Sequence, residues 1–170
     1  MPRIVVALTL LALLATASVA SGAADKQHWP RIDGKFRIAK GSSPVTYKGS
    51  ARSDELLGSH GSDTLSGRAG SDVLWGDHNP SGQPTSQRDT IYGGGGNDFI
   101  YGSHGRNRIS GGQGNDAISA HYGRGTIDCG PGRDIYHVPR SLKRRYKIRN
   151  CERVDRRPES KRGGGLKPLR

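Results

Sequence analysis

The stretch that decides the fold is 93–119, GGGGNDFIY GSHGRNRIS GGQGNDAIS, which consists of three consecutive units of nine residues. Each unit opens on Gly, carries a second Gly three places later and has Ile at its eighth position. The outer two units place Asp98 and Asp116 at the sixth position, whereas the middle unit places Asn107 there. The repeat therefore keeps its glycines and its apolar residue while it loses its carboxylate in one copy, and any proposed fold must explain this difference.

The same unit continues on both sides of this stretch. Its eighth positions are Leu56, Leu65, Leu74, Ile91, Ile100, Ile109, Ile118, Ile127 and Tyr136. Every interval is nine residues except the 17 residues from Leu74 to Ile91, so one turn carries an eight-residue insertion. Glycine recurring this often is costly inside a helix, whereas short strands joined by glycine turns accommodate it. Stacked strands of this kind bury one continuous apolar ladder, so the sequence predicts an all-β parallel β-roll, a β-solenoid, of about nine nonapeptide units.

Three of the units carry a family resemblance. GSHGSDTLS, GGGGNDFIY and GGQGNDAIS resemble the G-G-x-G-x-D-x-U-x nonapeptide of the RTX, or haemolysin-type, calcium-binding repeats. The resemblance covers residues 49–137. It implies that six residues of each unit form a calcium-binding turn and three form a strand, and that calcium is the bound cofactor. Many members of that family leave the cell through an uncleaved C-terminal signal, and this chain departs from that pattern.

In such a roll, successive units alternate between two edges, so residues 18 apart stack on one edge. One edge then has a complete carboxylate column, in which five aspartates flank at most four calcium gaps. The other edge loses its charge, because Asp63 and Asp89 are followed by Asn107 and Gly125. The predicted metal ligands are Asp54, Asp72, Asp98, Asp116, Asp134, Gly67, Gly70, Gly93, Gly96, Gly111, Gly114 and Gly132, with Asp63 and Asp89 as a weaker site.

Three side-chain rows allow two interpretations each. Arg88, Arg106 and Arg124 precede the sixth positions of the second edge, where their guanidinium groups either replace missing cations or lie in solvated loops. His60, His78 and His104 share the third position and form either a zinc ladder or ordinary surface. The third row, Trp75, Phe99 and Tyr101, is either a platform for sugars or a face covered by another part of the chain; we favour the covered face.

The N-terminus has the pattern of an export signal. Arg3 precedes the apolar run 4–15, and the small residues that follow suit cleavage after Ala20 or Ala24. The alternative is a membrane anchor, but the run is shorter than the roughly 20 residues needed to span a bilayer, and no later segment is apolar enough to span one. Residues 1–24 are therefore predicted to be a signal peptide of a secreted protein. Outside the cytoplasm, Cys129 and Cys151 are expected to form a disulfide rather than remain as two buried thiols.

Composition and charge divide the rest of the chain. Hydrophobic residues make up 32% of the chain and glycines number 26, which excludes an ordinary globular core. The formal charge is +12, and residues 140–170 hold 13 Lys or Arg against 3 Asp or Glu. We expect an N-terminal cap at 25–48, the repeats at 49–137, a disulfide-linked cap at 138–155 and a disordered basic tail at 156–170. The tail either binds an acidic polysaccharide, a cell-wall polymer or extracellular DNA through salt-sensitive contacts, or only aids solubility.

The sequence points away from catalysis and from specific recognition of nucleic acid. It has no H-E-x-x-H zinc motif and no nucleophile elbow, and no nucleic-acid-binding fold is recognisable. Its paired acids follow from the repeat without any catalytic demand. The prediction is a secreted, non-catalytic calcium-binding module that folds on exposure to extracellular calcium. The alternative is a calcium-dependent, lyase-like enzyme acting on acidic polysaccharide.

Overall fold

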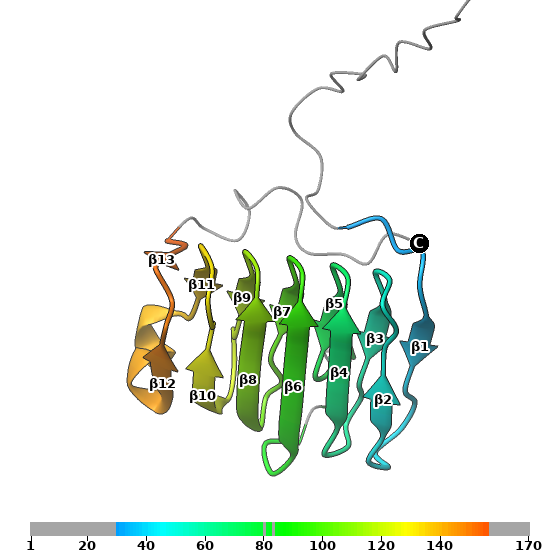
Figure 1. Cartoon of the computed structure of the whole chain (residues 1–170). Coiled ribbons are helices and arrows are strands. Elements are labelled where there is room, and N and C mark those ends of the chain that lie inside the picture. Colours follow the sequence, from blue (N-terminus) through cyan, green and yellow to red (C-terminus); the bar gives the residue numbers. More distant parts are fainter. Residues whose placement is uncertain (1–29, 80, 83, 157–170) are drawn as a thin grey trace, which may run out of the picture.

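The computed structural model describes residues 30–79, 81–82 and 84–156. Over these residues the chain is a flattened stack of coils between two parallel sheets (Figure 1). The seven-stranded sheet contains β1 (Phe36–Ile38), β3 (Glu55–Leu57), β5 (Val73–Trp75), β7 (Phe99–Tyr101), β9 (Ala117–Ser119), β11 (Ile135–His137) and β13 (Arg153–Val154). The six-stranded sheet contains β2 (Thr46–Lys48), β4 (Thr64–Ala69), β6 (Arg88–Gly95), β8 (Arg106–Gln113), β10 (Arg124–Asp128) and β12 (Tyr146–Arg149). The predicted all-β parallel β-roll is thus confirmed.

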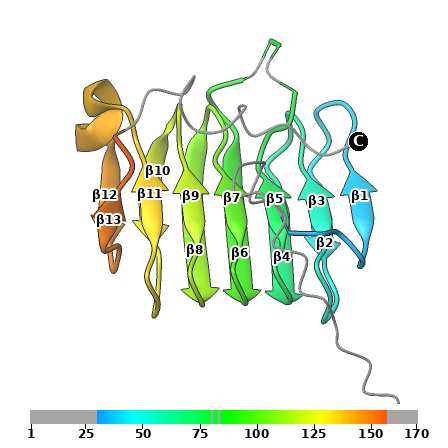
Figure 2. The same ribbon diagram turned by 90° about the horizontal axis from the view of Figure 1, so that it is seen from above.

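Every strand pairs in parallel with the strand one coil away. The apolar residues of neighbouring coils lie directly opposite one another, as in the pairs Leu56↔Leu74 and Ile109↔Ile127. Seen from above, the coils follow one another along the roll in chain order (Figure 2). The insertion leaves this register undisturbed, because Leu65 on β4 pairs with Ile91 on β6. The eight additional residues are therefore accommodated in the turn between β5 and β6.

The core is the predicted ladder of eighth positions. Leu56, Leu65, Leu74, Ile91, Ile100, Ile109, Ile118 and Ile127 are between 0% and 2% exposed, and Tyr136 is 9% exposed. Since burying one Leu or Ile side chain contributes about 1.5–3 kcal/mol, this single column is the main apolar contribution to the fold. It runs without interruption past the coils that lose their carboxylate.

The roll is longer than the nine units that the sequence predicts. β1 and β2 pair in register with β3 and β4, and β12 and β13 pair in register with β10 and β11. The segments expected to act as capping strands therefore continue the two sheets. They were not counted as units because their turns lack the repeated glycine pattern.

The C-terminal end of the roll combines a short helix with a cross-link. The 3₁₀ helix η1 (Arg140–Arg145) connects β11 to β12, and Cys129 and Cys151 form a disulfide with their Cα atoms 5.1 Å apart. This bond joins the turn after β10 to the segment between β12 and β13, the pairing that the sequence predicts. No helix among the described residues is long and apolar enough to cross a membrane.

The outer face of the seven-stranded sheet is partly covered. Val73 and Tyr101 are buried, and Ile32, Trp75 and Phe99 pack against them. Ile32 lies in the segment before β1, so part of the predicted N-terminal region does cover the aromatic row. The export signal and the tail residues from 157 onward lie outside the described residues.

Candidate calcium-binding edge

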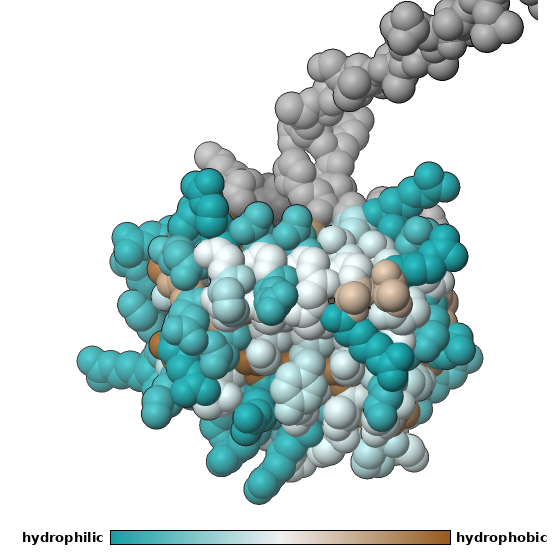
Figure 3. Space-filling view, viewed as in Figure 1, coloured by the Kyte–Doolittle hydropathy of each residue, from teal (hydrophilic) through white to brown (hydrophobic). Residues whose placement is uncertain are grey.

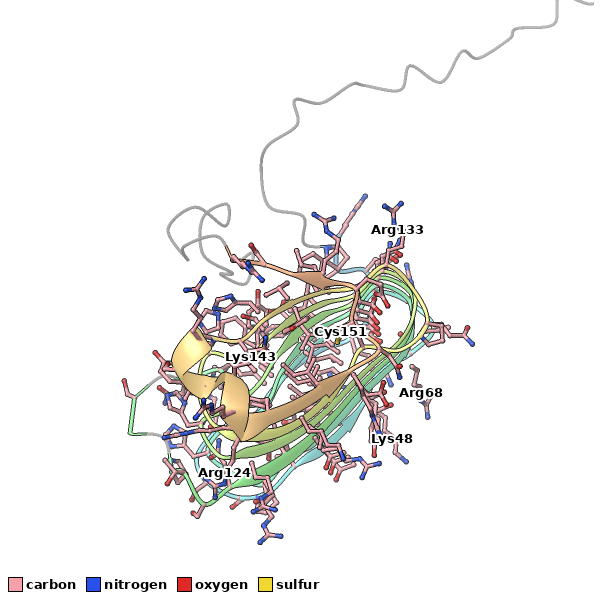
Figure 4. All side chains as sticks on the ribbon, turned by 90° about the vertical axis from the view of Figure 1, so that its left-hand side faces the viewer. Lys48, Arg68, Arg124, Arg133, Lys143 and Cys151 are labelled. Atoms are coloured by element: carbon pink, nitrogen blue, oxygen red, sulfur yellow. A yellow bond between two sulfur atoms is a disulfide. The ribbon has the colours of Figure 1, made fainter. Side chains whose placement is uncertain are left out.

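Two edges connect the sheets, and they differ in chemistry. The turns 67–72, 93–98, 111–116 and 129–134 lead from the six-stranded to the seven-stranded sheet, and we call this side the carboxylate edge. The turns 58–63, 76–89, 102–107 and 120–125 lead back and form the opposite edge. In the end-on view, the labelled Arg68 and Arg133 lie at the carboxylate edge and Arg124 lies on the opposite side (Figure 4). The predicted stacking of residues 18 apart is therefore found in the structure, with 26 separating Asp72 from Asp98 across the insertion.

The aspartates of the carboxylate edge form a hydrogen-bonded column. The backbone N–H of each sixth-position residue donates to one carboxylate oxygen of the next coil. The bonds run from Asp54 to Asp72 (2.7 Å), Asp72 to Asp98 (2.8 Å), Asp98 to Asp116 (2.9 Å) and Asp116 to Asp134 (2.7 Å). Each bond uses the Oδ1 atom of the accepting aspartate and restrains the orientation of that carboxylate.

The second oxygen of each carboxylate is left over. The Oδ2 atoms of Asp72, Asp98, Asp116 and Asp134 are buried without a hydrogen-bond partner, and all four residues are 0% exposed. Leaving a buried anionic oxygen unpaired is costly. A column of such oxygens on consecutive coils is suited to bind a hard divalent cation, because Ca²⁺ is coordinated by carboxylate and carbonyl oxygens.

The predicted glycines explain how the carboxylates are accommodated. A Cβ atom built on Gly67, Gly93 or Gly111 would collide with the Oδ2 atom of the aspartate five residues later. The first-position glycines therefore form the cradle that holds these oxygens. The fourth-position glycines stack on one another, because a Cβ on Gly96 would overlap the carbonyl oxygen of Gly70. Gly114 and Gly132 continue that stack in the next two coils.

Burial changes the acidity of the column. Desolvation, with a smaller contribution from neighbouring carboxylates, raises the pKa of Asp98 to about 7 and the pKa values of Asp72 and Asp116 to about 6. The pKa of Asp134 is also raised, with burial as the main cause. In the absence of a cation, the folded roll therefore favours the protonated acids, whereas a bound cation would favour the charged form.

A second ladder at the same edge was not anticipated from the sequence. The fifth-position side chains of successive coils accept backbone N–H groups from the following coil, as Asn97 does from Asn115 (2.8 Å) and Asn115 from Arg133 (2.9 Å). Ser71 accepts in the same way from Asn97 (3.1 Å). These bonds run in the opposite direction to the aspartate bonds, so each turn is fixed from both sides. The signal was the recurrence of Ser or Asn directly before Asp54, Asp72, Asp98 and Asp116.

The two ends of the carboxylate column are closed by different residues. At the N-terminal end, the Lys35 ammonium donates to the carbonyl oxygens of Lys48 (2.9 Å) and Gly49 (3.0 Å), and Ser50 donates to both oxygens of Asp54. Asp54 is therefore satisfied within the protein, unlike the later aspartates. At the C-terminal end, Glu152 accepts the N–H of Asp134 (2.8 Å) and extends the column by one carboxylate. Its spacing of 18 residues from Asp134 was the available signal.

On the opposite edge, only one of the two predicted aspartates has a free oxygen. Asp63 accepts N–H groups from Val45 (2.9 Å) and Ser59 (2.8 Å), so both of its oxygens are bonded. Asp89 accepts the N–H of Asp63 (2.8 Å), while its Oδ2 atom is buried without a partner. Burial raises the pKa of Asp89 to about 7. The structure therefore places Asp63 and Asp89 in consecutive coils, but it does not continue the column beyond them.

Asn107 shows why the charge is lost there. Its amide oxygen accepts the backbone N–H of Ser103 (2.9 Å), while its amide nitrogen donates to the Ser103 carbonyl (2.9 Å) and the Tyr146 hydroxyl (2.9 Å). Tyr146 pairs with Gly125 on the neighbouring strand, where a Cβ atom would collide with the Asn107 carbonyl oxygen. The hydroxyl then donates to the Tyr122 carbonyl (2.6 Å). A neutral network within the protein therefore satisfies the polar groups of this turn.

The structure does not support the two other predictions for this edge, that arginines replace cations and that histidines form a zinc ladder. Within the described part of the chain, Arg88, Arg106 and Arg124 form no ion pair with Asp63 or Asp89, so their guanidinium groups do not replace cations there. The described residues also contain no group of three or more His, Cys, Asp or Glu side chains arranged to hold a metal ion, which argues against a zinc ladder. By the same finding, a cation at the carboxylate edge needs backbone carbonyl oxygens in addition to the aspartates.

The insertion adds a buried polar cluster to the opposite edge. The Asp77 side chain is fully buried, accepts a bond from Gln87 Nε2 (3.1 Å) and lies 4.0 Å from His60 Nε2. Burial raises the pKa of Asp77, and the bond from Gln87 and the nearby histidines oppose that shift. This cluster anchors both ends of the insertion to the roll.

Comparison with known families agrees with this geometry. The model of the RTX calcium-binding nonapeptide repeat, in four copies, matches residues 48–77 and 85–118. The gap between the two matches coincides with the insertion. No curated protein and no solved structure matches the chain.

Proposed function

Because residues 48–77 and 85–118 match the RTX calcium-binding nonapeptide repeat and the chain has the parallel β-roll fold, we propose that it is a secreted, non-catalytic module whose folding is driven by extracellular calcium. The observation that carries the proposal is the file of four buried, unpartnered carboxylate oxygens on the carboxylate edge. RTX β-rolls are typically structural calcium-binding modules and are typically extracellular.

The residues that would hold calcium follow from the free oxygens. Asp72, Asp98, Asp116 and Asp134 offer Oδ2 atoms, and backbone carbonyls of the glycine turns would complete the oxygen ligands. Asp54 is already satisfied by Ser50, so we expect the gap next to Asp54 to bind calcium more weakly than the later gaps. Asp63 and Asp89 would form at most one weak site on the opposite edge.

Calcium would act on folding through charge. Carboxylates on adjacent strands lie about 4.8 Å apart and repel each other by roughly 1 kcal/mol per pair even at the dielectric constant of water. A divalent ion between coils removes this repulsion and satisfies the free oxygens, which couples binding to folding. Extracellular calcium modules often bind near 10⁻⁴–10⁻³ M, so the chain would stay unfolded inside the cell and fold after export.

A pair of matched substitutions tests the assignment. Asp98→Asn alters two central gaps of the carboxylate edge, whereas Asp63→Asn alters only the opposite edge, with the same change of charge. We expect Asp98→Asn to raise the calcium midpoint of folding by about tenfold or more, since hydrogen bonds and ion contacts of charged groups contribute about 1.5–3 kcal/mol each. Equal shifts in calcium titrations of the two variants would contradict the one-edge assignment.

The partner proposal concerns the tail. Residues 156–170 combine high positive charge with few apolar residues, which supports salt-sensitive attachment to an acidic polysaccharide or cell-wall polymer. Assays on acidic polysaccharides with and without calcium would separate this binding function from the lyase-like alternative, because only an enzyme shortens the polymer.

A further inference from the structure

The outward face of the six-stranded sheet carries a straight row of arginines. β6, β8 and β10 all begin with Arg, and Arg88 pairs directly with Arg106, which pairs directly with Arg124. Arg145 extends the row by one coil, because it precedes Tyr146, the register partner of Gly125. All four side chains are exposed. The strands hold the bases of these side chains about 4.8 Å apart.

A second row lies beside the first on the same face. It contains Thr90, Arg108, Thr126 and Lys147, which occupy one register position on β6, β8, β10 and β12. The first row and, from the second row, Thr90, Arg108 and Thr126 line a shallow hollow of about 510 Å³. The carboxylate in its lining, Asp89, is only 1% exposed, so the accessible surface of the hollow is basic and hydroxyl-bearing.

These charges have no counter-ion within the described part of the protein. Among the outward residues of β6, β8, β10 and β12, the acidic side chain is Asp128, and it is paired with Arg149 (3.0 Å). Like charges directly opposite on neighbouring strands destabilise a sheet. The row therefore costs stability unless an external anion neutralises it.

The figures show that the two basic rows lie on an accessible face of the molecule. Figure 3, which faces the six-stranded sheet, shows hydrophilic side chains projecting at its lower left, where β8, β10 and β12 begin. In Figure 4, Arg124 projects outward on the side of the roll away from Arg68 and Arg133. The basic rows are thus separate from the carboxylate edge, and a ligand on them does not compete with calcium for the same residues.

We propose that this face, which we call the arginine face (Arg88, Arg106, Arg108, Arg124, Arg145 and Lys147), binds a linear anionic polysaccharide lying along the axis of the roll. Such polymers carry a carboxylate or sulfate on successive sugar rings, and an extended sugar ring is about as long as the strand spacing. Arg binds such groups in bidentate fashion, and Thr90 and Thr126 supply hydroxyl groups for the sugars.

Nucleic acid fits the face less well. The phosphates of a duplex strand rise by about 3.4 Å per nucleotide along the helix axis and wind around it, so they do not follow a straight row of side chains, and single strands are bound chiefly through stacking on aromatic side chains. Tyr92 is the aromatic residue among the outward side chains of β6, β8, β10 and β12. The polysaccharide is therefore the occupant that spacing and composition favour.

The inference rests on the proposed function, since the rows align only in the folded roll, and the test separates the two. Far-UV circular dichroism in calcium first establishes whether each variant folds. Isothermal titration with a heparin octasaccharide, at two salt concentrations in the same calcium buffer, then measures binding by the folded full-length protein. The variant is Arg106→Gln with Arg124→Gln. The charge-matched controls are Arg37→Gln with Lys40→Gln on the other side of the roll, and Lys161→Gln with Arg162→Gln in the tail.

The arginine-face variant is expected to fold like the wild type and to bind the octasaccharide at least about tenfold more weakly, with a reduced salt dependence. The Arg37 and Lys40 control is expected to lose no more than about threefold, as for exposed charges at a distance, and the tail variant is expected to lose less than the arginine-face variant. Equal losses in all three variants, or the largest loss in the tail variant, would overturn the assignment to this face. Tighter binding of a single-stranded DNA of equal charge would overturn the assignment to a polysaccharide. A wild type that does not fold in calcium would contradict the proposed function instead.

Discussion

At the scale of single residues, the sixth position of each repeat determines what the turn requires. Where it is Asp98 or Asp116, one oxygen accepts a backbone N–H and the other is buried without a partner. Where it is Asn107, the amide both accepts and donates, and every polar atom finds a partner within the protein. The same backbone turn thus leaves a carboxylate oxygen without a partner in one case and satisfies every polar atom of the side chain in the other.

Substitution of Asn107 by aspartate tests this difference. Asn107→Asp removes two donated hydrogen bonds and places a charge at a site that is 1% exposed. We expect the free energy of unfolding in saturating calcium to fall by about 1–3 kcal/mol at pH 8, and by less at pH 5, where the buried acid is protonated. Denaturant unfolding measures the change. A variant more stable than the wild type in calcium would show that this turn gains a metal site.

The acidity of the column gives a pH prediction for the metal-free chain. Burial raises the pKa of Asp98 from 3.8 to about 7 and those of Asp72 and Asp116 to about 6. Because the folded pKa lies above the unfolded one, these groups favour folding most below about pH 4, and that contribution is lost as the pH rises through 6 and 7. Metal-free protein should therefore be more structured at pH 5 than at pH 8.

Circular dichroism in metal-depleted buffer checks this pH dependence, and Asp98→Asn provides the control, since its dependence should be weaker. A wild-type signal that does not change between pH 5 and pH 8 would contradict the prediction. In calcium the direction reverses, because protons and calcium compete for the same carboxylates, so the calcium midpoint should be higher at pH 5.

The repeat pattern predicted the aspartate column and the apolar ladder. It did not predict the residues that close the two ends of the column. The 18-residue spacing placed Asp72 and Asp116 on one edge because the period of a coil is fixed by its backbone. Glu152 was missed, since a longer acid in a turn without glycines does not match the motif. The contribution of Lys35 depends on the path of its side chain to two carbonyl oxygens, which sequence spacing does not reveal.

At the scale of elements, β12 and the short helix before it close the edge that has lost its charge. Tyr146 at the start of β12 is 6% exposed and connects Asn107 on β8 to the Tyr122 carbonyl before β10. Sequence analysis identified this region as a cap but gave no reason for its contact with Asn107, because the two residues are 39 positions apart. β1 and β2 were also assigned to a cap, since they pair with the roll without carrying its motif.

The contribution of this element is measurable by removing one hydroxyl group. Tyr146→Phe deletes the bonds to Asn107 and to the Tyr122 carbonyl, and we expect a loss of about 1–3 kcal/mol with a lower melting temperature in calcium. Tyr92→Phe is the matched control, because Tyr92 is 40% exposed, and it should change stability by less than about 0.5 kcal/mol. Calorimetry of both variants tests the prediction. Equal melting temperatures for the two would show that the hydroxyl network contributes nothing.

At the scale of the whole molecule, one apolar column and one carboxylate column run the length of the same roll. The apolar column includes residues of every coil from Leu56 to Tyr136, and the carboxylate column lies along one edge. With 32% hydrophobic residues, the chain has little other apolar surface to offset the repulsion between buried acids. Folding of the whole roll should therefore depend on the state of that one edge.

The measurement that tests this claim most directly is far-UV circular dichroism of the purified full-length protein during a calcium titration after complete chelation. The account predicts a spectrum without regular β-structure at neutral pH in the absence of calcium. It predicts a single cooperative change to a β-sheet spectrum as calcium is added, with a midpoint in the range of about 10⁻⁴–10⁻³ M, and no such change with magnesium at the same concentrations. A chelated protein that already shows the full β-sheet spectrum would contradict calcium-driven folding.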